Sequence, residues 1–286
     1  MPEGDTVLQT AARLHAALAG RVLTQADLRV PRFATADLVG RTVLDVTARG
    51  KHLLTRIDGG LTLHSHLRMD GAWRVYAAGE RWRGGPGHQI RAVLGNTEHT
   101  AVGYRLPVLE LLRTADEQQV VGHLGPDLLG PDWDPALALE RLLATPDRPL
   151  GEALLDQRNL AGIGNVYKCE LCFLARVTPW LPVAALPDGV LALLVTAAER
   201  LLHANRDRLA RTTTIPAELR ARPTAAPAAG ASSGSRRTPP PRVQERLYVY
   251  GRAHRPCLRC GATIRAADQD DRPTYWCPGC QSGPTP

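Results

Sequence analysis

The sequence predicts an α+β protein with an N-terminal β-sandwich or barrel, a helical second half and a cysteine-rich end. Short segments of alternating polarity, separated by Gly, Pro and Asp-Gly turns, fill residues 22–94. Helical periodicity replaces this alternation near residue 135, and two Cys-x2-Cys pairs lie close to the end of the chain. With 286 residues, the chain is long enough for two domains, each with its own hydrophobic core.

The first expected element is a helix that runs to Leu18. Asp5 or Thr6 can cap its start, and Gly20 can close its end. One face of this helix is apolar and comprises Val7, Leu8, Ala11, Leu14 and Leu18. Because such a face must be covered, we place the helix beside the strands that follow.

Regular short strands joined by tight turns are expected next, and they are typical of a sandwich or a barrel. The expected strands are 22–29, 42–48, 51–57, 61–67, 72–77 and 88–94. The expected helices of the second half are 135–144, 151–157, 165–174 and 187–204. We divide the chain into domains at 1–120, 121–211, 212–245 and 246–286.

Two glycines mark the turn between two of these helices. The segment 154–167 carries Gly162 and Gly164, and Asn165 begins the next helix. Exposed backbone N–H groups at a helix start bind phosphate well, and glycines let the ligand approach, so we predict a phosphate seat here. The alternative is an ordinary packed corner between helices.

The stretch 212–243 is rich in Pro, Ala, Gly and Ser. It has too few apolar side chains to order itself by burial, so we interpret it as a mobile linker or loop.

The strongest local motif is a set of four cysteines. Cys257 and Cys260 form one Cys-x2-Cys pair and Cys277 and Cys280 form another, with sixteen residues between the pairs. This spacing predicts one structural zinc ion with four thiolate ligands and a β-hairpin between the pairs. Cys169 and Cys172 form a further Cys-x2-Cys. We interpret them as buried thiols rather than as a second metal site, because no other ligand pair is evident.

The charge balance favours a polyanionic partner. The formal net charge is +7 and the pI is about 9.4. A bound Zn²⁺ with four thiolates lowers the net charge to about +5, which leaves this inference unchanged. Nothing before residue 20 resembles a signal peptide and no apolar run is long enough to span a bilayer, so we expect a cytoplasmic protein without membrane contact.

Three further sites suggest chemistry or phosphate binding. Removal of Met1 would leave Pro2 with a free secondary amine, which can attack an aldehyde carbon to give an iminium, and Glu3 can transfer the proton that such chemistry needs. The alternative is that Met-Pro-Glu is simply the start of a disordered tail. Lys51, at a tight turn entering a strand, and Arg272, near the expected hairpin tip, can each bind a phosphate. The alternative for both is an ordinary solvated side chain.

Several motifs in order resemble one family. They are Pro-Glu-Gly at 2–4, Arg-Gly-Lys-His at 49–52, Gly-Pro-Asp at 125–127, Asn-Leu-Ala-Gly-Ile-Gly-Asn at 159–165 and Tyr-Trp-Cys-Pro-Gly-Cys-Gln at 275–281. From Met1 to about Gln281, the chain resembles the formamidopyrimidine-DNA glycosylase and endonuclease VIII family of base-excision repair enzymes. The resemblance implies a two-layered β-sandwich, a helical domain with a helix–two-turn–helix motif, and a zinc finger.

The resemblance also implies an activity and roles for individual residues. Pro2 matches the Schiff-base nucleophile that attacks C1′ of the damaged nucleotide, and Glu3 matches the acid that assists sugar opening. Successive β- and δ-elimination would then cut the strand. The residues that match the family's phosphate-gripping positions are Lys51, Asn165 and Arg272, of which Lys51 also counts as catalytic. Met69 matches the position that fills the void left by the extruded base, and the alternative for Met69 is a core methionine.

The endonuclease VIII branch is the closer match, because of Trp73-Arg-Val and the Tyr-Trp-Cys at 275–277. That branch implies excision of oxidised pyrimidines from double-stranded DNA by a monomer that associates with the nucleoid through DNA. Two alternatives remain: an 8-oxoguanine or formamidopyrimidine glycosylase, and a non-catalytic zinc-ribbon protein that only senses lesions.

Overall fold

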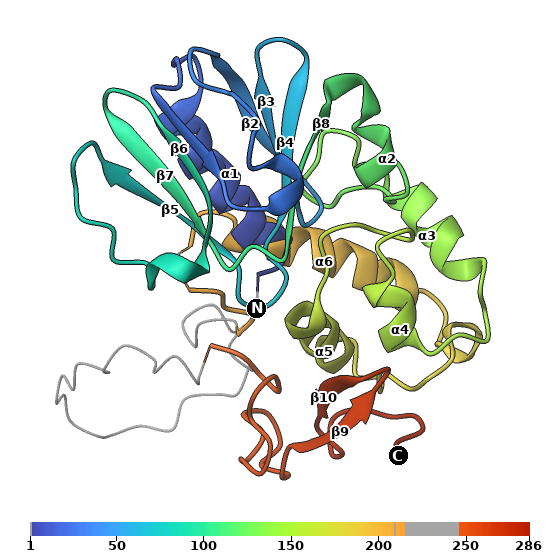
Figure 1. Cartoon of the computed structure of the whole chain (residues 1–286). Coiled ribbons are helices and arrows are strands. Elements are labelled where there is room, and N and C mark those ends of the chain that lie inside the picture. Colours follow the sequence, from blue (N-terminus) through green and yellow to red (C-terminus); the bar gives the residue numbers. More distant parts are fainter. Residues whose placement is uncertain (1, 209, 215–245) are drawn as a thin grey trace, which may run out of the picture.

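A computed structural model describes residues 2–208, 210–214 and 246–286, and Figure 1 shows its arrangement. Two four-stranded antiparallel sheets form a β-sandwich, and helix α1 (Gly4–Leu18) packs against strands of both. The helical part lies beside the sandwich, and a small two-stranded sheet follows it. Of the two architectures expected from the sequence, a β-sandwich or a barrel, the structure has the sandwich. The greater part of the expected linker, from 215 onward, lies outside the described residues.

The first sheet has the strand order β1-β6-β7-β5, and the second has the order β2-β3-β4-β8. The strands of the first sheet are β1 (Gln25–Leu28), β6 (Ile90–Gly95), β7 (His99–Tyr104) and β5 (Ala72–Ala77). The strands of the second are β2 (Val43–Arg49), β3 (His52–Ile57), β4 (Leu61–His66) and β8 (Val108–Arg113). Aliphatic side chains from both sheets and from α1 form one shared core.

Strands β7 and β8 are absent from the six strands expected from the sequence, so that expectation was incomplete. Five of the six residues of β7 are buried, which removes the alternation of apolar and polar side chains that identifies a half-exposed strand. Strand β8 has the sequence Val-Leu-Glu-Leu-Leu-Arg, which consists mainly of good helix formers. Pairing with β4 outweighs this local preference.

Helix α1 begins earlier than expected, and neither Asp5 nor Thr6 caps it. The helix starts at Gly4 with Glu3 as its N-cap residue, and no side chain donates or accepts a capping bond there. Asp5 lies inside the first turn, where its carboxylate receives bonds from Arg211 and Tyr167. The cap prediction failed because a distant arginine competes for that carboxylate.

The helical part contains four longer helices close to the expected positions. They are α3 (Pro135–Leu143), α4 (Leu150–Leu155), α5 (Asn165–Leu174) and α6 (Val190–Asn205). A short helix α2 (Gln118–Val121) precedes them, and 3₁₀ helices occupy Pro31–Phe33, Gly87–Gln89, Thr114–Asp116 and Val183–Ala185. Asp134 caps α3 by accepting from the N–H groups of Ala136 and Leu137, as the sequence Asp-Pro at a helix start favours. These helices share a second core, separate from that of the sandwich.

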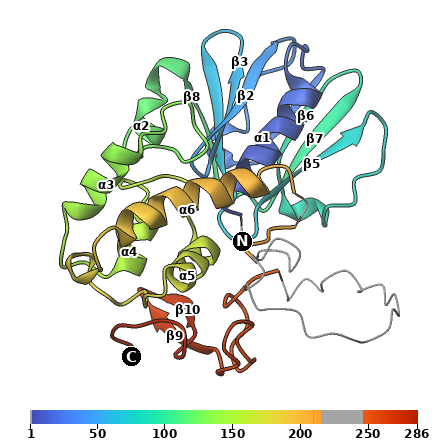
Figure 2. The same ribbon diagram turned by 180° about the vertical axis from the view of Figure 1, so that it is seen from behind.

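The two strands β9 (Arg265–Gln269) and β10 (Arg272–Trp276) form the hairpin that was expected between the cysteine pairs. Asp270 and Asp271 form its tip, and both have positive φ angles. The hairpin lies against α5 in both views (Figure 1 and Figure 2). No helix in the described part of the chain is long and apolar enough to cross a membrane.

Candidate active site

Glu3 lies at the junction of the sandwich and the helical part, and its side chain is fully buried. Its carboxylate accepts hydrogen bonds from the backbone N–H groups of Gly164 at 2.9 Å, Val166 at 2.8 Å and Tyr167 at 3.3 Å. These groups begin α5, where unpaired donors and the positive end of the helix dipole favour an anion. The carboxylate one residue after Pro2 is therefore held in one place by the helix–turn–helix.

The phosphate seat predicted at this turn stays a prediction, and three of the backbone N–H groups there already bind the carboxylate of Glu3. Gly162 and Gly164 are buried, and the N–H groups of Gly164, Val166 and Tyr167 donate to the carboxylate of Glu3. A Cβ atom at Gly164 would lie 2.5 Å from Cδ of Glu3, so only glycine leaves room for this carboxylate. The turn is closely packed and binds the carboxylate of Glu3.

Arg211 connects Glu3 to a second buried acid. Its guanidinium makes two hydrogen bonds to Asp5, stacks over the Tyr167 ring at 4.7 Å, and lies 3.7 Å from Glu3. Burial alone would raise the pKa of Asp5, but the bonds and charge of Arg211 outweigh it and hold that pKa below its usual value. The sequence analysis missed Arg211 and Asp5, because 206 residues separate them.

Lys51 is half-buried in the turn between β2 and β3. Burial lowers the pKa of its ammonium to about 8; Glu3 opposes this shift, while Arg272 and Arg211 add to it. Lys51 is thus within electrostatic range of two other predicted site residues, Glu3 and Arg272. Asp127 holds the turn, because its carboxylate accepts from the N–H of Gly50 at 2.7 Å.

Asn165 and Arg272 lie where α5 meets the hairpin. The side-chain amide of Asn165 donates to the carbonyl of Pro273 at 2.8 Å, and Pro273 follows Arg272 on β10. The Oδ1 atom of Asn165 is buried and has no hydrogen-bond partner among the described residues. Arg272 is exposed beside the hairpin tip, as the sequence predicted.

Two charged side chains on α5 were missed by the sequence analysis. Glu170 is fully buried and accepts from the N–H groups of Tyr248, Val249 and Tyr250, which fixes the segment that leads into the cysteine-rich end. Lys168 is also fully buried and donates to the hydroxyl of Thr274 on β10. The available signal was the run Lys168–Cys172, which puts charges next to apolar residues in one short helix.

Pro2 is half-buried and Met69 is exposed, with 58% of its surface accessible. The interpretation of Met69 as a core methionine is therefore excluded. Met69 lies on the connection between β4 and β5. The structure brings together Glu3, Lys51, Asn165 and Arg272.

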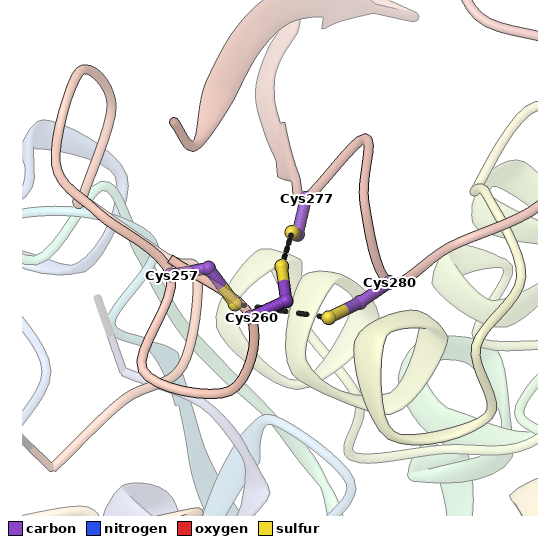
Figure 3. A group of neighbouring side chains, drawn as sticks. All are labelled: Cys257, Cys260, Cys277 and Cys280. Atoms are coloured by element: carbon purple, nitrogen blue, oxygen red, sulfur yellow. Dashed lines mark hydrogen bonds between the residues drawn. The ribbon is translucent and has the colours of Figure 1, made fainter. Parts of the chain in front are cut away.

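The four cysteines of the hairpin region converge on one point (Figure 3). Their sulfur atoms all lie within 4.8 Å of one another, with 3.8 Å between Cys257 and Cys280 and 3.4 Å between Cys260 and Cys277. Ligands about 2.3 Å from a tetrahedral zinc ion lie about 3.8 Å apart, so this donor set fits one Zn²⁺. Protein fills all four positions, and the zinc is structural.

Cys169 and Cys172 are buried, which confirms their interpretation as buried thiols. Burial raises the pKa of Cys169 to about 11, so the thiol stays protonated at neutral pH. Within the described ranges, the four hairpin cysteines are the one group of His, Cys, Asp or Glu side chains arranged to hold a metal ion.

Comparison with known families gives three matches along the chain. Residues 1–123 match the Formamidopyrimidine-DNA glycosylase N-terminal domain, residues 124–215 match the Formamidopyrimidine-DNA glycosylase H2TH domain, and residues 255–283 match the Zinc finger found in FPG and IleRS. The matches cover the site described above and the zinc ligands.

Among curated proteins, the chain is 65% identical over 290 residues to a Streptomyces coelicolor protein named Probable endonuclease 8 2, with 100% of this chain and 96% of the relative covered. It is 46% identical to the Mycolicibacterium smegmatis DNA-(apurinic or apyrimidinic site) lyase Nei2, with 99% of both chains covered. Among solved structures, a Lactococcus lactis Fpg (MutM) bound to DNA containing N7-Benzyl-Fapy-dG has a TM-score of 0.76 at 24% identity, covering 99% of this chain and 100% of that one. That likeness concerns the fold.

Proposed function

The chain belongs to the formamidopyrimidine-DNA glycosylase family, and we propose that it excises oxidised pyrimidines from double-stranded DNA. As a member of this family it is a DNA glycosylase with lyase activity at apurinic or apyrimidinic sites, and it acts in base excision repair. It carries one structural zinc. The observation that carries the assignment of roles is the fixed carboxylate of Glu3 next to Pro2.

Pro2 is the nucleophile in this proposal. Once Met1 is removed, its secondary amine attacks C1′ of the damaged nucleotide and the bond from C1′ to the base breaks, with a proton from water going to the base. The C1′–O4′ bond then opens, O4′ receives the proton that the amine loses, and a cationic iminium remains. That cation accepts electrons when a proton leaves C2′ and the 3′ phosphate departs. A second elimination removes a proton from C4′ and releases the 5′ phosphate. The half-buried setting of Pro2 suits an amine that must reach a flipped nucleotide.

Glu3 is the proton-transfer group. Its carboxylate is buried and held by three backbone N–H groups, so it keeps its position relative to the amine during the reaction. Arg211, 3.7 Å away and itself held by Asp5, places a positive charge beside this carboxylate. A glutamate held in this way takes a proton from the attacking amine and returns it to the sugar.

Lys51, Asn165 and Arg272 bind the phosphates that flank the flipped nucleotide. Support comes from their position around Glu3 and from the exposed guanidinium of Arg272 at the hairpin. Met69 enters the duplex in place of the extruded base, which agrees with its exposed apolar side chain. The zinc site holds the hairpin that carries Arg272.

The test is side-by-side cleavage of duplexes that carry thymine glycol or 8-oxoguanine, together with borohydride trapping on an abasic-site duplex. We expect trapping, and faster cleavage at thymine glycol. Faster cleavage at 8-oxoguanine would reassign the substrate to the formamidopyrimidine type. A protein that binds the duplexes but gives neither cleavage nor a trapped adduct would be a lesion sensor.

We also propose that the enzyme works as a monomer in the cytoplasm, associated with the nucleoid through its DNA substrate. The net charge of +7 supports contact with polyanionic DNA. Sedimentation of the free protein and of its complex with one duplex tests the monomeric state.

A further inference from the structure

Four histidines gather on the outer face of the second sheet, directly beside Lys51. His52 stacks on His64 with ring centroids 5.1 Å apart, and it meets His66 edge-on at 4.9 Å and His123 edge-on at 6.1 Å. Strand pairing explains the cluster, because His52 lies opposite His66 across β3 and β4. The proposed mechanism uses none of His52, His64 and His123.

Hydrogen bonds connect two of these histidines to an acid. Nδ1 of His52 lies 2.8 Å from Nε2 of His64, and Nδ1 of His64 lies 3.0 Å from Oε2 of Glu110. Glu110 faces His64 directly across β4 and β8. The chain Glu110–His64–His52 therefore crosses three strands and ends at the residue next to Lys51.

The acid fixes the position of each proton in this chain. An ionised Glu110 can only accept, so Nδ1 of His64 must carry a proton. Neutral His64 then accepts at Nε2, so Nδ1 of His52 must be the donor. The tautomer of His66 is fixed by a different contact, because its Nδ1 accepts from the backbone N–H of Arg68 at 2.9 Å. These assignments leave Nε2 of His52 unprotonated.

The charged neighbours of the cluster are mostly positive. They are Lys51 before β3, Arg68 after β4 and His123 after α2, with Glu110 on β8 as the one acid bonded to the cluster among the described residues. Arg49, opposite His52 on β2, turns away to Asp132 and to the carbonyl of Gly125. Burial lowers the pKa of His52 to about 3, and the neighbouring imidazoles and Lys51 add to this shift. Burial also lowers the pKa of His66 to about 4, with further contributions from Lys51, Arg68 and His64.

We propose that Glu110 and His64 are positioning residues that act through His52, and that the Glu110–His64–His52 chain takes up a proton when a DNA phosphate binds beside Lys51. This inference rests on the proposed role of Lys51. An added proton on His64 sits against the Glu110 carboxylate, and the bond to His52 reverses its direction. Nε2 of His52 then changes from acceptor to donor, and the added proton increases the positive charge beside Lys51.

The expected proton uptake can be estimated from the approach of one DNA phosphate. An opposite charge within about 4–6 Å raises a pKa by about 1–3 units, which takes the pKa of His52 from about 3 to at most about 6 and gives an uptake of at most about half a proton at pH 6. Lys51 and the Pro2 amine are already protonated at that pH, so they do not contribute.

The first measurement needs no DNA. Imidazole ¹⁵N shifts of the free holoprotein at pH 7.5 should identify His64 and His52 as the Nδ1-protonated tautomers. A proton on Nε2 of His64 would overturn the chain of bonds.

The second measurement counts protons. Calorimetry of binding to a duplex with a tetrahydrofuran abasic analogue, at pH 6 in buffers of different ionisation enthalpy, gives the uptake per complex. Glu110→Gln keeps an acceptor for His64 but removes the charge, so the uptake should fall by at least half. Glu98→Gln is the matched control, since Glu98 is exposed, lies 3.9 Å from His99 and belongs to the other sheet's β6–β7 turn. It should match the wild type.

Equal uptake in the wild type and Glu110→Gln, or none in the wild type, overturns the proton-uptake proposal. The glycosylase assignment would survive that result, because trapping tests it separately. A wild type that fails to bind the abasic duplex contradicts both proposals.

Discussion

At the scale of single residues, Glu3 has both a structural and a chemical part to play. Its carboxylate accepts hydrogen bonds from the backbone N–H groups at the start of α5, and it directly follows the proposed nucleophile Pro2. The buried guanidinium of Arg211 lies 3.7 Å from its carboxylate. Position and charge at this residue therefore depend on contacts made by the rest of the fold.

Replacement of Glu3 tests its proposed role. Glu3→Gln keeps the size of the side chain but offers one acceptor oxygen and turns an amide toward backbone N–H donors. We expect base removal to fall by about 10²–10⁴-fold, while cleavage of a preformed abasic site falls much less. The same preparation supplies its own control through the abasic-site reaction. Unchanged base removal would contradict the role of Glu3.

Titration of Lys51 should lower the affinity for DNA as the pH rises from 7 to 9. The pKa of its ammonium is lowered to about 8, so the charge is present at pH 7 and largely lost at pH 9. If bound DNA requires the charged form, affinity falls about tenfold over that interval. Lys51→Arg keeps its charge at both pH values and should flatten the profile. Binding of the tetrahydrofuran duplex at pH 7 and pH 9 measures this, and parallel profiles would exclude Lys51 as the titrating group.

At the scale of elements, the helix–turn–helix can bind the Glu3 carboxylate because Gly164 has no side chain that would collide with it. Gly164→Ala puts a Cβ atom 2.5 Å from Cδ of Glu3, so the carboxylate or the turn must move. We expect a loss of about 1–3 kcal/mol in the free energy of unfolding, together with slower base removal. Gly87→Ala is the control, since no atom lies within 4 Å of its added Cβ. Equal stability and activity in both variants would show that the close contact is unimportant.

The zinc hairpin should affect binding and leave the chemistry intact. Cys277→Ser removes one of four ligands, so we expect loss of zinc and weaker binding of the abasic duplex. The single-turnover rate at saturating enzyme should stay within a few fold, because the hairpin only holds DNA. Cys169→Ser is the control: this thiol is buried under the hairpin outside the zinc site, and its loss should leave the zinc content unchanged. A large fall in the saturated rate of Cys277→Ser would place the hairpin in the chemical step.

Local patterns in the sequence predict most elements, since strand alternation, helical spacing and the cysteine pairs all act within short stretches. Strand β7 was not predicted because it is buried on both faces and therefore lacks alternating polarity. Strand β8 was not predicted because its residues favour a helix. The site was harder to predict. Pro2, Glu3 and the zinc ligands follow from motifs, but the bonds of Glu3 to α5 join residues 161 positions apart. No local pattern encodes such a contact, so the sequence did not show that Glu3 binds the start of α5.

At the scale of the whole molecule, the sandwich and the helical part meet at the proposed active site, and contacts between them fix its parts. Gly4 donates to the carbonyl of Gly162, and Asp127 of the helical part receives the N–H of Gly50 at the turn before Lys51. The start of the chain and the Lys51 turn are thus both fixed by the second domain. The proposed nucleophile, proton-transfer group and phosphate-binding residues come from different parts of the sequence and act as one site.

The most direct test locates the covalent bond on the mature protein. Borohydride trapping on an abasic-site duplex, followed by nuclease digestion and peptide mass spectrometry, should place the sugar adduct on the nitrogen of Pro2, in a chain that lacks Met1. An adduct on Lys51 or another side chain, or full trapping by protein that retains Met1, would contradict the account.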